Sequence, residues 1–476
     1  MKSVPGRGAD CFLLRKGGGG LAFGMASGGL RPACGESVEC DADMRIVQVL
    51  DGGELASAVS AEVDMLCSSM VSNRAYATGN AAVDSATARM WGALGSAARL
   101  VIRKLAYSAP IIIRFHNDAD GSGGALSLHA SITDACARAG GANGNIVWIM
   151  QRGVVYSAQD ASADVAVAGG YSSAEKPMLL LVDFGTTTDS NGGIEALRGA
   201  FDIVWLDHHP VVEGFAGARL EHYINPWNFG CDSNYTAGLL SAAFSRTFSD
   251  VETRTYEQAS LIGDYSSYAD PGDAAAQETS TLLDFITSDL EAVYGPSKSN
   301  VTPQEIVAIL SSPIRRRELL DYANIRLEEA IERGLANARM HETPYAFVYV
   351  LDFENVREDD GSRYPLPGRF SSKLLSRLNG MDMRRVVVVV YVGAYVLMRA
   401  DKELCAEMSL LDVIAALKEM HGGLVENGGG HRCAGAVKLR DKAYGKEVAA
   451  SAVRIIKSMA GGTAGEVGAA GSGANR

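Results

Sequence analysis

The sequence has few cysteines and no cysteine pattern of the kind that marks a zinc site or a disulfide framework. Its eight cysteines are Cys11, Cys34, Cys40, Cys67, Cys136, Cys231, Cys405 and Cys433, and no two of them form a CxxC pair. This spacing argues against a zinc knuckle and against a small disulfide-rich fold. We therefore expect reduced thiols in a cytoplasmic protein.

Long hydrophobic runs are also missing. The longest obvious run, Val386–Val392, has the length of a strand and is far too short to span a membrane. The first residues show no basic stretch followed by an apolar segment and a small-residue cleavage site. With 47% hydrophobic and 21% charged residues, the composition is typical of a globular protein. We therefore expect neither export nor a membrane partner.

Positive charge is in deficit, because the formal net charge is −12 at pH 7. A protein that coats nucleic acid is usually basic, since contacts with phosphates supply most of its affinity. The deficit argues against a broad DNA-coating surface. It is compatible with an enzyme that grips a short strand locally and uses metal ions as its main positive charge.

Aliphatic strand patterns alternate with helical patterns from Pro110 onward. A helix is predicted over Gly123–Gly140, and the predicted strands are Ile111–Phe115, Ile146–Met150, Met178–Phe184 and Phe201–Leu206. Near-continuous runs of Val, Ile and Leu separated by helices indicate a mainly parallel sheet covered on both faces. The predicted fold class is therefore α/β.

The remaining sequence predicts further regions and a second lobe. Further strands are predicted at Tyr345–Asp352, Arg385–Val392, Tyr395–Ala400 and Ala434–Leu439. We predict disorder over residues 1–43 (or a true start at Met44), a helical extension over 44–106, a first α/β domain over 107–290, a helical connector over 291–343, a smaller α/β domain over 344–459 and a disordered tail over 460–476. We expect a cleft between the two lobes.

Four short motifs with aspartate or histidine follow predicted elements of the first domain. They are His116-x-Asp118-x-Asp120-Gly121, Asp183, Asp207-His208-His209-Pro210 and Gly263-Asp264. Three of the four stand at the carboxyl end of an aliphatic strand, where open α/β sheets bind ligands. We expect His116, Asp118 and Asp120 to alternate along extended backbone, so that their side chains point the same way.

The residue types in these motifs indicate a site for divalent cations. Carboxylates with some imidazole suit manganese or magnesium, whereas thiolates would favour zinc. Two ions roughly 3.5–4 Å apart need a bridging carboxylate, for which Asp183 is suited. His209 could stabilise charge on a phosphate or donate a proton to the leaving oxygen. Alone, Asp183 or Asp264 would be interpreted as a cap or turn residue, but capping and turns do not account for all four motifs together.

Glycine-rich and basic residues in the second lobe indicate an anion-binding site. Three glycines precede His431 in Asn427-Gly428-Gly429-Gly430-His431, and such a turn lets backbone amides approach a phosphate. Arg369 stands with two serines at a predicted helix N-terminus, which also favours anions. A plain glycine turn and a capped helix start are the alternative interpretations.

Together, the segments HNDADG, VDFG, LDHHP, GD and NGGGHRCAGA resemble the motifs of the DHH phosphoesterase superfamily. The glycine-rich segment is similar to that of the branch with a RecJ-type DHH-associated C-terminal domain. The resemblance covers roughly residues 108–458 and is closer to the archaeal RecJ-like proteins than to the long bacterial enzyme. It implies two divalent cations, manganese or magnesium, the first held by His116, Asp118 and Asp183 and the second by Asp120, Asp183, His208 and Asp264.

The same resemblance implies roles for the other motif residues. Asp207 would orient a neighbouring histidine, His209 would face the scissile phosphate, and the substrate would be bound by Gly429, Gly430, His431 and Arg369. We predict a phosphoesterase that hydrolyses single-stranded DNA or RNA from an end, with replication or repair proteins as candidate partners. An enzyme acting on short oligonucleotides, nucleotide bisphosphates or cyclic dinucleotides is one alternative. A non-catalytic scaffold of a replication complex is the other.

Overall fold

The computed structural model describes four strands within residues 11–50 and then residues 53–72, 77–139, 145–171, 173, 175–295, 298, 300–343, 346–357, 362–381 and 385–459. The chain divides into two compact units, residues 1–323 and 324–476. Among the described residues, none of the helices combines the length and the apolar composition that crossing a membrane requires. The predicted tail over 460–476 lies outside the described residues.

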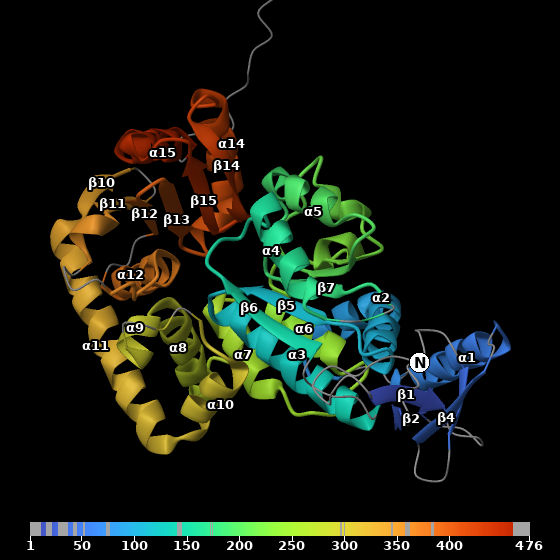
Figure 1. Cartoon of the computed structure of the whole chain (residues 1–476). Helices are drawn as coiled ribbons and strands as arrows, with labels where there is room; N and C mark the ends of the chain where they lie inside the picture. The colour runs from blue at the N-terminus through green and yellow to red at the C-terminus, as the bar shows by residue number, and fades with distance from the viewer. Residues whose placement is uncertain are drawn as a thin grey trace, which may run out of the picture. The chain divides into compact units, whose positions relative to one another are not determined.

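A small N-terminal sheet opens the first unit (Figure 1). Its order is β1-β2-β4-β3, and its strands are β1 (Cys11–Arg15), β2 (Leu21–Ala26), β3 (Ser37–Cys40) and β4 (Arg45–Leu50). Three of these strands lie within residues 1–43, where we predicted disorder. Strands this short, set between glycine-rich stretches, leave too few residues for a period-two pattern to stand out in the sequence.

A five-stranded parallel sheet forms the centre of the first unit. Its strands, in spatial order, are β6 (Ile146–Gln151), β5 (Ile111–His116), β7 (Met178–Val182), β8 (Asp202–Leu206) and β9 (His222–Ile224). Every neighbouring pair is parallel, so the prediction of a mainly parallel sheet is confirmed. The sequence pattern missed β9, because three residues are too few to show a strand period.

Helices cover both faces of this sheet, as predicted, and Figure 1 shows α3 and α6 on one side and α4 and α5 on the other. Ile111, Ile113 and Phe115 join the core beneath α2 (Ala81–Ala106), α3 (Ala119–Arg138) and α6 (Ala237–Ser245). Ile112 faces the other way, into the core beneath α4 (Ala158–Gly169) and α5 (Asn191–Leu197). Successive strand residues point to opposite faces, so a strand buried on both sides is apolar at nearly every position. The buried charge in β5, Arg114, is paired with Asp164.

The remaining helices of the first unit surround this layered core. α7 (Arg254–Gly263) packs against both α3 and α8 (Ala274–Ser288). The end of α7 lies beside the start of α3, because a Cβ on Gly263 would lie 2.7 Å from the Cβ of Ala119. The 3-10 helices of this unit are η2 (Thr188–Ser190), η3 (Ala216–Arg219) and η4 (Pro226–Phe229). The other α-helices are α1 (Gly53–Met70), α7 (Arg254–Gly263), α8 (Ala274–Ser288), α9 (Leu290–Tyr294), α10 (Pro303–Ser311) and α11 (Pro313–Asn337), which continues into the second unit.

The second unit is a mixed sheet with helices. Its strand order is β10 (Arg339–Glu342), β11 (Phe347–Asp352), β12 (Val386–Val392), β13 (Tyr395–Ala400), β15 (Ala434–Leu439) and β14 (Val425–His431). Only β11 and β12 pair in parallel among these strands. The helical elements are η5 (Phe353–Asn355), α12 (Pro367–Met381), α13 (Leu404–Glu407), α14 (Leu410–Met420), η6 (Lys442–Tyr444) and α15 (Gly445–Met459). The predicted second α/β unit is therefore present.

Two strands of this sheet stand where we predicted something else. β10 lies in the expected helical connector, and its largely exposed side chains carry no apolar pattern that would have marked a strand. The glycine-rich segment is not a turn but the edge strand β14, paired with β15. Gly430 has φ +141°, and a Cβ there would lie 2.3 Å from the Ala434 carbonyl oxygen. The absence of a side chain at Gly430 therefore lets β14 and β15 approach each other closely at this point.

Candidate metal centre

The predicted ligands of the first unit meet at one edge of the parallel sheet. His116 ends β5, Asp183 follows β7, and Asp207 and His208 follow β8. Parallel neighbouring strands end at the same edge, which brings these residues together. Asp183 has φ +62°, a left-handed conformation that aspartate tolerates better than most residues but that still costs of order 1–3 kcal/mol. Such strain in a non-glycine residue is concentrated at functional sites.

The first motif reaches this edge by a different route from the one we predicted. Asp118 is the N-cap of α3, and its Oδ1 accepts a hydrogen bond from the Gly121 amide at 2.9 Å. Asp120 lies in the first turn of α3, so the expected alternation along an extended strand is wrong for this residue. The glycines let the turn close tightly, because a Cβ on Gly121 would lie 2.3 Å from the His116 carbonyl oxygen. The helix turn, not strand pleating, directs Asp120 inward.

Asp183 joins two groups of ligand atoms. Its Oδ2 lies 3.2 Å from His116 Nδ1, which also lies 2.9 Å from Asp118 Oδ2. Its Oδ1 lies 3.5 Å from His208 Nε2. His208 Nε2 in turn lies 3.6 Å from Asp120 Oδ2 and 3.3 Å from Asp264 Oδ2. The two oxygens of one carboxylate thus face two different sets of ligands.

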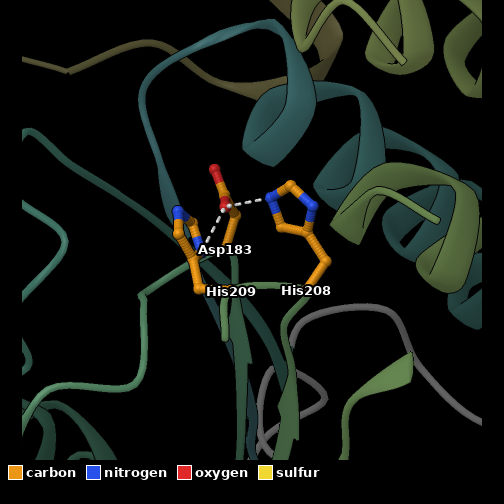
Figure 2. Close-up of side chains that lie close together, drawn as sticks. All are labelled: Asp183, His208 and His209. Carbon is orange, nitrogen blue, oxygen red and sulfur yellow. Dashed lines mark ion pairs between the residues drawn. The ribbon is translucent and has the colours of Figure 1, made fainter. Parts of the chain in front are cut away.

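Figure 2 shows the Asp183 carboxylate between the rings of His208 and His209. Three groups, Asp183–His208–His209, His116–Asp118–Asp183 and Asp120–His208–Asp264, each have ligand atoms within 4.8 Å of one another. All six residues that we predicted as metal ligands are therefore brought together with His209.

The pKa values of the side chains in this centre are shifted from their ordinary values. Burial and the charge of Asp183 raise the pKa of Asp120 well above its ordinary value, and burial also raises the pKa of Asp264. Burial would raise the pKa of Asp183 as well, but hydrogen bonds from His116 and His208 outweigh it and hold that pKa well below the ordinary value. Burial would lower the pKa values of His116 and His208, but the carboxylates around them raise both well above the usual range. Four carboxylates thus surround two imidazoles, those of His116 and His208.

This donor set fits divalent cations. The raised pKa values of His116 and His208 favour protonated rings, whose charge balances the carboxylates, and a cation would supply that positive charge directly. The donors are carboxylate oxygens and imidazole nitrogens with no thiolate among the grouped residues, a set suited to manganese or magnesium. The two faces of Asp183 match the bridging carboxylate that a pair of ions requires.

Neighbouring groups hold the ligands in position. The His208 Nδ1–H donates to the Ser233 carbonyl oxygen at 2.9 Å, which turns Nε2 toward the carboxylates. Such a bond to the other ring nitrogen sets the tautomer that a metal ligand needs. Asp120 accepts from the amides of Ala237 and Gly238 at 2.9 and 2.8 Å, at the N-terminus of α6. Each carboxylate oxygen has a second lone pair, so Asp120 can cap the helix and still face His208.

Asp207 and His209 form a separate pair beside the ligands. Asp207 is fully buried, and its Oδ1 lies 2.9 Å from His209 Nδ1. Its oxygens also accept from the amides of Gly185 and His209. Burial would lower the pKa of His209, but the Asp207 carboxylate outweighs it and raises that pKa. The contact predicted between Asp207 and a neighbouring histidine is thus present.

Three residues that support the centre were not predicted from the sequence. Asp284 of α8 accepts from the Ala119 amide at 2.6 Å and so anchors the start of α3. Ser233 binds His208, and Asn225 donates to the His209 carbonyl oxygen at 2.9 Å. An asparagine before a proline signals only a turn, and an aspartate within a helix gives no signal of a partner far away in the chain.

The predicted substrate-binding residues lie in the second unit. Arg369 is in the first turn of α12, and Gly429, Gly430 and His431 belong to β14; the His431 side chain lies outside the described residues. Arg399 of β13 pairs with Ala434, which also pairs with His431, so the strand register places these residues across neighbouring strands. A basic residue therefore stands two strands away from the glycine-rich segment.

Comparisons with known proteins find a distant curated relative and solved structures of similar fold. No known protein-family profile matches the chain. An uncharacterized protein of Methanocaldococcus jannaschii is 23% identical over 407 residues, which cover 74% of this chain and 52% of that protein. The chain thus spans about half the length of the curated relative that it matches. Among solved structures, RecJ of Thermus thermophilus in complex with Mn²⁺ is similar with a TM-score of 0.48 at 16% identity, over 76% of this chain and 55% of that one.

A second solved structure covers more of the chain. The DHH domain of a member of the s1p family of ribosomal proteins has a TM-score of 0.70 at 19% identity, over 85% of this chain and 98% of that one. The fold and the centre define a two-unit α/β protein with carboxylates and histidines at the edge of a parallel sheet. The fold of the chain is similar to the fold of this DHH domain, as the resemblance predicted.

Proposed function

We propose that this protein is a DHH-type phosphoesterase that uses two divalent cations, Mn²⁺ or Mg²⁺. One observation carries the proposal: Asp183 turns Oδ2 to His116 and Oδ1 to His208, at 3.2 and 3.5 Å. A carboxylate shared in this way by two sets of ligands is what a pair of ions needs. Asp183 stands at the carboxyl edge of a parallel sheet, which is where open α/β sheets bind ligands.

Two sets of ligands are proposed at this centre. The first ion would be held by His116, Asp118 and Asp183, and the second by Asp120, Asp183, His208 and Asp264. Two such ions would supply an activated water at neutral pH and would neutralise charge on a phosphoryl oxygen. The side chains themselves would hold the ions, and the hydrogen bonds that His208 and Asp120 make to the backbone keep these ligands in place.

His209 and Asp207 have a proton-handling role in this proposal. Asp207 holds His209 through Nδ1 and raises its pKa, which favours the protonated ring. A protonated imidazole beside the ligands can donate a hydrogen bond to a phosphate oxygen or a proton to the leaving oxygen. Asp207 would act only through His209, as the residue that orients it.

Single-stranded nucleic acid, cleaved from an end, is the proposed substrate. The motif resemblance to RecJ-like proteins supports it, and we assign substrate binding in the second unit to Gly429, Gly430, His431 and Arg369. The net charge of −12 favours a second candidate, an enzyme of short oligonucleotides or nucleotide bisphosphates, because such substrates need fewer phosphate contacts.

A nuclease assay tests both candidates. The full chain is incubated with Mn²⁺ and end-labelled single-stranded DNA, single-stranded RNA, a dinucleotide or a nucleotide bisphosphate. We expect stepwise release of mononucleotides from one end, and loss of this activity in Asp264→Ala but not in Asp250→Ala, which changes an exposed carboxylate outside the centre. Faster cleavage of the dinucleotide or the bisphosphate would favour the second candidate. Failure of the Mn²⁺-loaded protein to hydrolyse any of the four would refute the proposal.

A further inference from the structure

An exposed tryptophan lies beside the ligand His208. The chain has four tryptophans, and Trp227 of η4 is 41% exposed, whereas the other three are buried or half-buried. Single exposed apolar side chains are common on protein surfaces, so what distinguishes Trp227 is its hydrogen bond to the backbone of the predicted ligand His208.

Hydrogen bonds fix this tryptophan to the ligand loop. Its indole N–H lies 3.1 Å from the His208 carbonyl oxygen and 2.9 Å from Ser233 Oγ. Ser233 also bonds to His208 directly. Its hydroxyl donates to the His208 carbonyl oxygen at 2.6 Å, and its own carbonyl accepts from the His208 ring. The backbone amide of Trp227 donates to Asn225 Oδ1, and Asn225 Nδ2 donates to the His209 carbonyl oxygen. The polar atom of the indole is thus occupied, and the rest of the exposed ring is carbon.

Other exposed apolar side chains follow the ligand motifs. Val211 and Val212, shortly after His209, are 37% and 38% exposed, and Tyr265, directly after Asp264, is 40% exposed. Tyr265 has φ +54°. The segment after it is tied to the residue after Ser233, since Ser266 Oγ donates to the Asn234 carbonyl oxygen at 2.6 Å. The loop that holds Trp227 therefore also contacts the segment that carries the fourth ligand motif.

We propose that Trp227 is the platform on which a nucleobase of the substrate stacks while its phosphate lies at the metal centre. This inference rests on the proposed function. Carboxylates and cations can position a phosphate, but they offer nothing to the apolar face of a base, and the rings of His116 and His208 are engaged by carboxylates. A tryptophan held rigidly beside them supplies that face at little cost in conformational entropy. Because every base has a π-face, the platform should select for the presence of a base and only weakly for its identity.

Substrates with and without a base test the platform. Oligonucleotides whose terminal nucleotide at the digested end is intact or abasic are compared in the wild type, Trp227→Ala and Trp227→Phe. Trp227→Ala should lower kcat/KM for the intact end by between about 5-fold and about 100-fold. It should leave the abasic end, which is already slow in the wild type, nearly unchanged. Trp227→Phe keeps a ring and should retain most of the discrimination, and Trp91→Phe, a half-buried tryptophan on α2, should behave as the wild type.

Equal losses on both substrates would overturn the inference, since they would show that the ring only supports His208. An unchanged kcat/KM on the intact end in Trp227→Ala would also overturn it. Tryptophan fluorescence gives a readout that does not need turnover: a mononucleotide with Mn²⁺ should quench emission in the wild type but not in Trp227→Ala, and ribose 5-phosphate should quench neither. If the wild type hydrolyses no oligonucleotide, the proposed function fails, while the quenching still reports whether a base stacks.

Discussion

The substitution Asp183→Asn tests the bridging role of this carboxylate. Asparagine has the same shape and also tolerates the left-handed conformation at φ +62°, so the variant should fold. It removes one negative charge between the two sets of ligands. For a unit charge pair at about 4 Å and an effective dielectric of about 20, the lost attraction is about 4 kcal/mol, which corresponds to roughly a thousandfold weaker metal binding.

Two measurements together decide this prediction. The Mn²⁺ content per chain, measured after equilibration at micromolar Mn²⁺, should fall from two ions toward one or none, and hydrolysis should fall by at least about a thousandfold. Asp250→Asn, which changes an exposed carboxylate, should keep both. A variant Asp183→Asn that holds two ions with unchanged affinity and turns over at the wild-type rate would refute the bridging role and the argument built on the two Asp183 oxygens.

Three further predictions follow from the same geometry. His116 and His208 have pKa values raised well above 6.5 in the folded state, so the stability that they contribute is complete below about pH 6.5 and is lost as the pH rises through the raised values. In EDTA, the Tm should therefore fall as the pH rises above about 6.5, and Mn²⁺ should reduce the fall; a Tm in EDTA that does not change with pH would contradict this. Asp207→Asn removes the carboxylate that raises the pKa of His209, so the pH–rate profile should shift its alkaline limb to lower pH, and kcat should fall by roughly 10- to 100-fold; an unshifted profile would assign Asp207 a purely structural role. Gly121→Ala places a Cβ 2.3 Å from the His116 carbonyl oxygen and should cost about 1–3 kcal/mol in the free energy of unfolding, measured by denaturant titration, whereas Gly153→Ala meets nothing within 4 Å and should be neutral.

Much of the centre is predictable from short stretches of sequence, because the decisive signals are local. Aliphatic runs such as Ile111–Phe115 are apolar at nearly every position, which a strand buried on both faces requires, and β5, β7 and β8 lie where those runs predict them. Residues directly after parallel strands must lie at one edge of a sheet. The convergence of His116, Asp183 and His208 could therefore be expected before any coordinates.

Features that depend on pairing between distant segments could not be predicted in this way. The glycine-rich segment looks like a turn, and only its pairing with β15 makes it a strand. Asp120 looks like a strand residue, but it lies in the first turn of α3, and amides of α6, which packs against α3, hold both of its oxygens.

The sequence by itself determined which side chains could serve as ligands and at which edge of the sheet they would gather. The reason is that each buried aliphatic strand is followed directly in the chain by the residues with ligand side chains. The tertiary structure alone decided how those ligands are oriented. Asp284 reaches Ala119 across 165 residues, and Ser233 reaches His208 across 25. A hydrogen bond needs its partner within about 3 Å in space, and no local pattern in the chain records which distant residue will be there.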